Sequence, residues 1–144
     1  MSPVKPECWI FDFDGTIVDN REISVIDHDA ELKNTYCIYA SCRLLRSLFD
    51  NNQEVIILTA RNESFREELL SWLKQYNLNA SELIMRSDGD IRSDIDFKRD
   101  VILNQILPKY DIVGAFDDHK PVVEMLRSLE ITTFDVAGND YKDT

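Results

Sequence analysis

The feature of the sequence that most limits its fold is an alternation between short apolar runs and longer segments of helix length. The runs are rich in Ile, Val and Phe and are bounded by polar residues, which is typical of buried strands. They cover residues 8–13, 54–60, 82–87, 111–117 and 131–136. Strands that alternate with helices are joined by right-handed parallel crossovers, so the pattern predicts a three-layer α/β fold, an open parallel sheet with helices on both faces.

The longer segments carry helix signals of their own. They cover residues 35–51, 62–78, 93–110 and 119–130. Asn62 and Ser93 stand where the second and third need a capping side chain, and Pro121 lies in the first turn of the fourth, where a missing N–H costs nothing. We expect one domain over residues 1–144, with its core at about 8–136 and a short polar tail at the C-terminus.

Composition narrows the class of protein. The chain has 27 acidic and 16 basic residues and a net charge of −11, which argues against a broad basic surface for nucleic acid or membrane. It shows no apolar run of transmembrane length and no signal-peptide pattern, so a cytoplasmic protein without membrane contact is expected. Its cysteines, Cys8, Cys37 and Cys42, form no CxxC pair and are expected to be buried, reduced thiols.

Polar residues follow several of the predicted strands. Asp12 and Asp14 end the first, Thr59 ends the second, and Asp117 with Asp118 ends the fourth. In an open α/β sheet the working site lies beyond these carboxyl ends. Close carboxylates repel by about 4 kcal/mol per pair at an effective dielectric near 20, so a cation is expected among them. Hard oxygen ligands without matching His or Cys point to Mg²⁺.

An acidic magnesium site suits a phosphorylated substrate, and one of its carboxylates could itself be the nucleophile. Gly15 and Thr16 fit the same chemistry. A tight turn after the strand would aim their backbone N–H groups at phosphoryl oxygens.

Several motifs along the chain together resemble a known superfamily. "DFDGT" (12–16), "ILTAR" (57–61), Lys98 and "AFDDHK" (115–120) are similar, in order and spacing, to the four motifs of the haloacid dehalogenase (HAD) phosphatases. The resemblance implies an open Rossmann-like fold and a phosphatase that works through an aspartyl phosphate.

The resemblance also implies roles for single residues. Asp12 would attack phosphorus, and Asp14 would protonate the leaving oxygen and then take a proton from water. Thr59 and Lys98 would hold the phosphoryl oxygens. Mg²⁺ would be held by Asp12, the backbone carbonyl of Asp14, and the pair Asp117 and Asp118, one of them directly and the other through water.

A closer resemblance is to the 3′-phosphatase domain of bacteriophage-type polynucleotide kinase/phosphatase. It is carried by "ILTAR", "GDIRSDIDFK" (89–98) and "DDHKPVVEML" (117–126). It implies that Arg61 contacts the substrate phosphate and that Asp94, one helical turn before Lys98, orients that lysine. For Arg61, a salt bridge at a strand end is the competing interpretation.

The chain departs from that family in two respects. It has no GxxxxGK[ST] loop, so 5′-kinase activity is not expected. The family has a substrate-binding arginine in the loop after the first motif. In this chain the corresponding stretch contains only Arg21, which is out of register with that position. The roughly 40 residues between the first two motifs leave no room for a large cap domain, so an open site suited to a polymer end is expected. His28 is expected in a solvated loop and His119 at a helix start.

The leading hypothesis is therefore a Mg²⁺-dependent phosphatase that removes 3′-terminal phosphates from DNA or RNA, with a kinase or ligase that could act alongside. One alternative is a phosphatase of free nucleotides or other small phosphomonoesters, which the acidity of the chain favours. Another is a non-catalytic HAD-like module that binds a partner. The sequence leaves open DNA against RNA, the acceptance of a 2′,3′-cyclic phosphate, and the oligomeric state.

Overall fold

The sheet is built from the strands that the apolar runs predict. The computed structural model describes residues 4–19, 32 and 35–137 of the chain. Its parallel five-stranded sheet has the order β5-β4-β1-β6-β7. These strands are β1 (Glu7–Phe11), β4 (Glu54–Asn62), β5 (Glu82–Arg86), β6 (Asp111–Asp117) and β7 (Thr133–Asp135). The chain reverses direction across the sheet at β1, which lies between β4 and β6, and ligand sites form at such a point.

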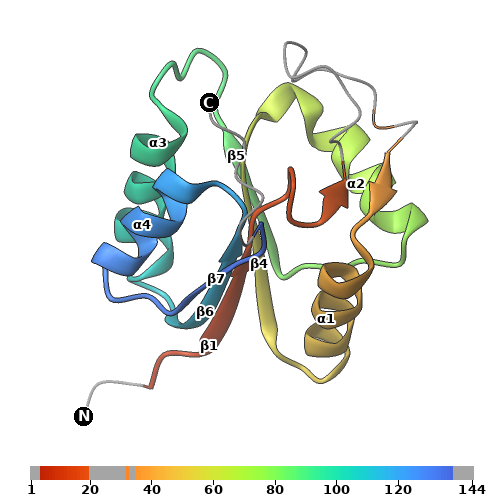
Figure 1. Ribbon diagram of the computed structural model, residues 1–144, viewed down its shortest axis with the longest axis horizontal. Helices are drawn as coiled ribbons and strands as arrows, with labels where there is room; N and C mark the ends of the chain where they lie inside the picture. The colour runs from red at the N-terminus through yellow and green to blue at the C-terminus, as the bar shows by residue number, and fades with distance from the viewer. Residues whose placement is uncertain (1–3, 20–31, 33–34, 138–144) are drawn as a thin grey trace.

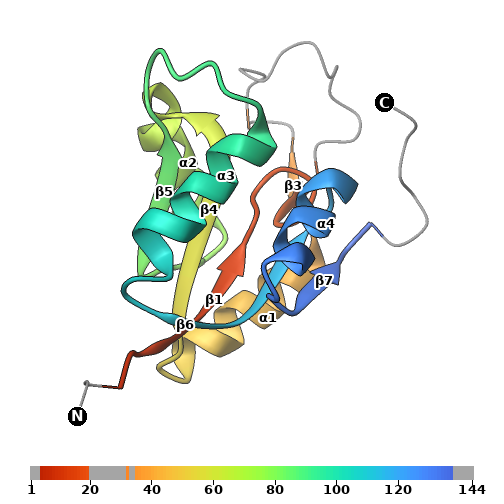
Figure 2. The same ribbon diagram turned by 90° about the vertical axis from the view of Figure 1, so that its left-hand side faces the viewer.

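Helices cover both faces of the sheet, as predicted. α1 (Tyr39–Asp50) and α2 (Arg66–Gln75) lie on one face, while α3 (Asp94–Val101) and α4 (Lys120–Ser128) lie on the other (Figure 1). Figure 2 shows α3 and α4 side by side in front of the strands. The expectation of a three-layer α/β fold is therefore confirmed.

The predicted caps are present. The side chain of Asn62 accepts a hydrogen bond from the Ser64 amide at the start of a short 3₁₀ turn, η2 (Glu63–Phe65), which leads into α2. Ser93 accepts one from the Asp96 amide at the start of α3. Each bond satisfies a backbone donor that the first helical turn leaves without a partner.

The first predicted helix begins later than the sequence indicates. Residues 36–37 form strand β3 (Tyr36–Cys37), which pairs antiparallel with β2 (Val18–Asp19), and α1 begins only at Tyr39. The backbone N–H of Ile38 donates to the Ile17 carbonyl at 2.7 Å, which ties this segment to the turn after β1. The apolar spacing of residues 35–51 does not encode that long-range pairing.

The third helix changes its winding before it ends. α3 is followed directly by a π-helical turn, η3 (Ile102–Ile106), in which the Leu107 amide donates to the Ile102 carbonyl at 2.9 Å. The helical conformation therefore stops just before Pro108, where the sequence predicts the end. A π-turn adds one residue per turn and commonly lies in helices that carry functional residues.

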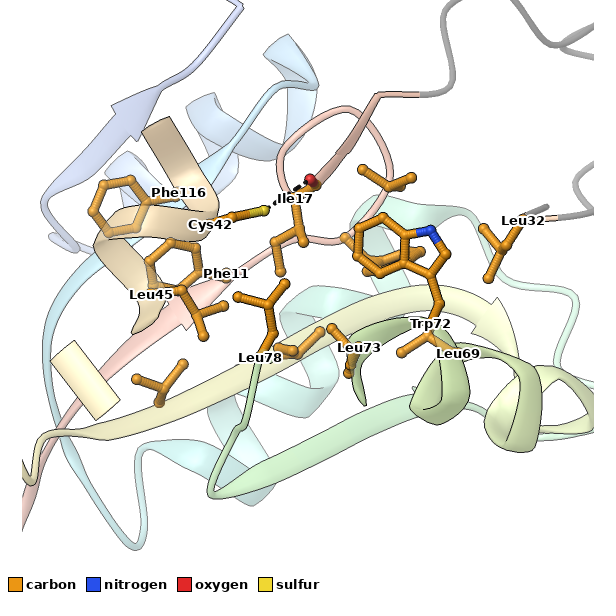
Figure 3. Close-up of a cluster of buried hydrophobic side chains, with 14 of the residues drawn as sticks. Phe11, Ile17, Leu32, Cys42, Leu45, Leu69, Trp72, Leu73, Leu78 and Phe116 are labelled. Atoms are coloured by element: carbon orange, nitrogen blue, oxygen red, sulfur yellow. Dashed lines mark hydrogen bonds between the residues drawn. The ribbon is translucent and has the colours of Figure 1, made fainter. Parts of the chain in front are cut away.

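The central strands are buried on both faces, which explains why they appear as nearly continuous apolar runs. In β1, Phe11 packs on the face of α1 and α2, and Ile10 on the face of α3 and α4. Figure 3 shows the first of these clusters, where Trp72 and Leu69 of α2 lie near Leu32 and where Cys42 points at the Ile17 carbonyl. Burying each such large apolar side chain contributes about 1.5–3 kcal/mol, so the end of β1 is held firmly.

The cysteines form no disulfide. Cys8 and Cys42 are buried and Cys37 is half-buried. Burial raises the thiol pKa of both Cys8 and Cys42 to about 12. Within the described residues no helix is both long enough and apolar enough to span a lipid bilayer.

Candidate active site

Three carboxylates meet where β1 and β6 end side by side. Asp12 follows the last residue of β1, and Asp117 is the last residue of β6, with Asp118 after it. One oxygen from each of these side chains lies within 4.8 Å of the others. Such a spacing suits the shared coordination of one hard cation. The structure thus brings together three of the residues predicted to bind the metal.

Lys98 lies within this group of acidic side chains. Its ammonium is 2.8 Å from Oδ1 of Asp12 and 3.0 Å from Oδ2 of Asp117, and its side chain is only 6% exposed. Burial alone would lower the pKa of Lys98, but the charges of Asp12 and Asp117 outweigh it and raise the pKa above its ordinary value. The lysine is therefore a fixed positive charge beside Asp12.

The environment of Asp12 is strongly acidic. Burial raises the pKa of the Asp12 carboxyl well above its usual range, the charge of Asp117 raises it further, and Lys98 opposes them both. Burial also raises the pKa of Asp118. A divalent cation at this point would favour the ionised carboxylates, because it supplies more positive charge than one ammonium can.

Gly15 lets the turn after β1 approach Asp118 closely. Its φ is +80°, and a Cβ on it would lie 2.0 Å from Oδ2 of Asp118. No other residue type fits that space without moving the carboxylate. Gly15 therefore has a steric role beside the acidic residues.

The amides of Gly15 and Thr16, which the sequence assigns to the phosphate, donate within their own turn in the structure. The Gly15 N–H donates to the Val18 carbonyl at 3.0 Å, and the Thr16 N–H donates to the Phe13 carbonyl at 3.3 Å. The turn therefore uses these donors to close itself. Thr16 serves the site through its hydroxyl, which is buried and lies 3.2 Å from Oδ2 of Asp12.

Thr59 lies inside β4 rather than at its end, because the strand continues to Asn62. Ile57 pairs with Phe11, so Thr59 is two residues beyond that pair, level with the turn that carries Asp14. The threonine is buried, and its Oγ1 accepts a hydrogen bond from the Arg61 amide at 3.1 Å. It therefore faces the same end of the sheet as Asp12.

Arg61 and Asp14 form a two-pronged ion pair. Nε of Arg61 lies 2.8 Å from Oδ2 of Asp14, and the second bond, from Nη2 to Oδ1, is 2.7 Å long. The guanidinium also lies over the rings of Phe13 and Phe65, at 5.6 and 5.5 Å from their centres. The competing interpretation of Arg61, a salt bridge, is therefore present in the structure. Among the described residues its buried Nη1 has no hydrogen-bond partner, which leaves the N–H groups of this nitrogen for a ligand.

Asp94 does not contact Lys98 as the sequence suggested. Its Oδ1 instead accepts a hydrogen bond at 2.8 Å from Nη2 of Arg86, a buried arginine at the end of β5. Arg86 is not among the residues that the sequence predicts at the site. The one signal for it is an arginine at the end of an otherwise apolar strand, with aspartates four and eight residues later.

The remaining predicted residues lie at the margin of the site. His119 is exposed at the start of α4, as expected, and its backbone N–H donates to Oδ1 of Asp117 at 3.0 Å. Arg21 and His28 lie outside the described residues.

Comparison with known proteins gives the family. Residues 6–141 match the family described as the polynucleotide kinase PNKP phosphatase domain. Over 138 residues the chain is 25% identical to a protein of Autographa californica nuclear polyhedrosis virus that is named as a bifunctional polynucleotide kinase/RNA ligase. That match covers 94% of this chain and 20% of the viral protein, so this chain spans about a fifth of its relative.

Solved structures agree with this family. A chain of the Pnkp1/Rnl/Hen1 RNA repair complex superposes with a TM-score of 0.85 at 26% identity, over 92% of this chain and 42% of that one. The D,D-heptose 1.7-bisphosphate phosphatase of B. bronchiseptica, complexed with magnesium and phosphate, gives 0.62 at 14% identity, over 91% of this chain and 80% of that one, and it supports the fold alone. The chain belongs to the family of polynucleotide kinase PNKP phosphatase domains, within the HAD phosphatases, and is a phosphoric monoester hydrolase.

Proposed function

We propose that the protein removes 3′-terminal phosphates from polynucleotides through a phosphoryl group carried on Asp12. The observation that carries the proposal is the position of the Asp12 carboxylate, at the end of the central strand between the Lys98 ammonium and the acidic pair Asp117 and Asp118. A nucleophile for phosphoryl transfer needs positive charge beside it, since both it and the substrate are anions. Asp12 lies next to one such charge and within a group suited to hold another.

Mg²⁺ fits the donor set. Asp12, Asp117 and Asp118 would hold it, together with the backbone carbonyl of Asp14, because these are hard oxygen ligands in a buried acidic group that one ammonium does not neutralise. When bound, the ion would supply charge that offsets the negative oxygens of the phosphoryl group.

The chain's own residues account for both chemical steps. An oxygen of Asp12 attacks phosphorus, the bond from phosphorus to the 3′ oxygen breaks, and Asp14 in its protonated form gives that oxygen its proton. A water molecule then attacks the aspartyl phosphate while Asp14 takes its proton, which releases inorganic phosphate and restores Asp12. Thr59 and Lys98 hold the phosphoryl oxygens in both steps.

Arg61 is proposed to bind the substrate phosphate through Nη1, which has no hydrogen-bond partner in the part of the chain that the structure describes. The other two nitrogens of the guanidinium hold Asp14, so a phosphate on Arg61 lies beside the acid that protonates its leaving oxygen. Asp94 is proposed to act from further away, through Arg86.

A polynucleotide end as the substrate is supported by the family, whose description names the phosphatase domain of a polynucleotide kinase. The names of the relatives also include an RNA ligase and an RNA repair complex, so we propose that this phosphatase acts beside a kinase or ligase. A phosphatase of small phosphomonoesters is the second candidate, because the net charge of −11 opposes long contacts with nucleic acid.

The test compares phosphate release from a 3′-phosphorylated oligonucleotide, the same oligonucleotide with a 5′ phosphate, and a 3′-mononucleotide. We expect the highest kcat/KM for the first, loss of activity in EDTA with recovery in Mg²⁺, and none in Asp12→Asn. A higher kcat/KM for the mononucleotide would favour the second candidate. Near wild-type turnover in Asp12→Asn would exclude the aspartyl-phosphate route.

A further inference from the structure

Arg86 joins three parts of the chain that surround the site. Its Nε donates to the Ala60 carbonyl of β4 at 3.0 Å, and its Nη1 donates to the Arg92 carbonyl in the loop after β5 at 2.7 Å. Its Nη2 donates to Oδ1 of Asp94, the first residue of α3, at 2.8 Å. The guanidinium also lies 4.8 Å from the centre of the Phe97 ring on the same helix. One side chain therefore ties together β4, the 87–93 loop and α3.

The two elements that Arg86 connects carry groups proposed to hold the phosphate. Ala60 stands between Thr59 and Arg61 on β4, and Asp94 stands one turn before Lys98 on α3. Among the described residues, Arg86 makes no hydrogen bond or ion pair with a residue proposed to touch substrate. Its bonds go instead to the neighbours of those residues in the chain. Arg86 therefore links β4 and α3, the two elements that carry these groups, without itself entering the site.

Phosphoryl transfer is sensitive to the distance between the Lys98 ammonium and the Asp12 carboxylate. The Lys98 ammonium meets Asp12 at 2.8 Å, and a shift of about 1 Å in a catalytic group can reduce turnover by about 100-fold. A helix whose first residue is fixed to the neighbouring strand cannot slide along it. We propose that Arg86 is a positioning residue, which keeps the start of α3 against β4 and so holds Lys98 at Asp12. The inference rests on the proposed function of Lys98.

The test substitutes Arg86→Gln, which cannot reach the carbonyl groups and Asp94 together. kcat and KM are measured with p-nitrophenyl phosphate and with a 3′-phosphorylated oligonucleotide, at a temperature where circular dichroism shows the variant to be folded. We expect kcat to fall by about 10- to 100-fold on both substrates and KM to change by less than about 3-fold, because Lys98 acts on the transferred phosphoryl group whatever its leaving group is. Arg86→Lys should recover part of the loss.

Two arginines provide matched controls. Arg66 also donates to the backbone of β5, at the Leu83 carbonyl, but it belongs to α2 and pairs with Glu63. Arg92 lies in the loop after β5 and pairs with Asp90 of that loop and with Asp100 of α3, but it does not reach β4. We expect Arg66→Gln and Arg92→Gln to lower thermal stability and to keep kcat within about 2-fold, since neither connects β4 to α3.

If Arg86→Gln does not fold, Asp94→Asn tests the same link at its exposed end, where the carboxylate is 53% exposed. A fall in kcat of about 3- to 10-fold on both substrates is then expected. Unchanged kcat in the folded variant, or a loss limited to the oligonucleotide, would overturn the inference. A wild-type protein that hydrolyses no phosphomonoester would instead overturn the proposed function.

Discussion

The Asp14 carboxylate and the Arg61 guanidinium are joined by two hydrogen bonds, at 2.8 and 2.7 Å, in a pair where only 6% of the arginine side chain is exposed. The residue proposed as acid and base is therefore held in place by the residue proposed to bind phosphate. A planar fork makes this geometry possible, and a lysine cannot reproduce it because its ammonium donates from a single point.

Replacement of Arg61 should therefore impair both binding and proton transfer. We expect Arg61→Lys to lower kcat/KM by about 100-fold or more, with effects on kcat as well as KM. Arg46→Lys is a matched control, because Arg46 lies on α1 and donates to the Tyr76 carbonyl, away from the site. Steady-state kinetics on the 3′-phosphorylated oligonucleotide measure both. An Arg61→Lys variant with normal kcat would show that Asp14 does not depend on the ion pair.

Alanine substitutions at Gly15 and Gly89 distinguish the cost of a left-handed backbone from the cost of a steric clash with Asp118. Both have a left-handed φ, +80° and +81°, but a Cβ on Gly15 would meet Asp118 at 2.0 Å, whereas nothing lies within 4 Å of a Cβ on Gly89. Gly15→Ala and Gly89→Ala should each lose about 1–2 kcal/mol of stability from the backbone alone. Only Gly15→Ala should also weaken Mg²⁺ binding, because it displaces the Asp118 carboxylate.

The measurement for this pair is a Mg²⁺ titration of phosphatase activity, with urea denaturation to record stability. We expect the half-activating Mg²⁺ concentration to rise by about 10-fold or more in Gly15→Ala and to stay at the wild-type value in Gly89→Ala. Equal shifts in the two variants would mean that strain, and not the approach to Asp118, determines the effect.

The parts of the fold that the sequence predicted are those with local causes. The strands were predictable because their side chains are buried on both faces. The caps Asn62 and Ser93 were predictable because each accepts a hydrogen bond from an amide within three residues of it. The β2–β3 ribbon and the bonds of Arg86 join segments far apart in the chain, and no periodicity encodes such contacts. The same holds within the site.

The meeting of the three carboxylates was predicted correctly from their residue type and their position at the ends of strands. Asp12, Asp117 and Asp118 come together because parallel strands end at one edge of the sheet. The bonds that the Gly15 and Thr16 amides make within their own turn were not predicted, because the sequence does not show that the turn closes on Phe13 and Val18. Hydrogen bonds of the backbone depend on the path of the chain and not on residue type.

The buried thiols make the protein less stable in alkali. Because the pKa of Cys8 and of Cys42 is raised from 9.0 to about 12 by burial, the folded protein keeps protons there that the unfolded chain loses above pH 9. Their contribution to stability is complete below pH 9 and is lost as the pH rises toward 12. Urea midpoints at pH 8 and pH 10.5 should show this fall, and Cys8→Ala should show a smaller one. If the urea midpoint of Cys8→Ala falls as much as that of the wild type, Cys8 does not contribute to the loss of stability in alkali.

Removal of Lys98 should destabilise the metal-free protein more than a usual lysine substitution. Lys98→Met leaves Asp12 and Asp117 buried without their ammonium, and breaking a buried pair in this way costs about 3–5 kcal/mol. Lys109→Met is the control, because Lys109 is exposed and lies 3.8 Å from Glu82, a contact worth about 0–1 kcal/mol. Thermal unfolding in EDTA and in Mg²⁺ measures the difference. We expect Mg²⁺ to raise the Tm of Lys98→Met by more than it raises that of the wild type, since a cation then supplies the missing charge. An equal Mg²⁺-induced rise in all three proteins would mean that the ion does not bind at these carboxylates.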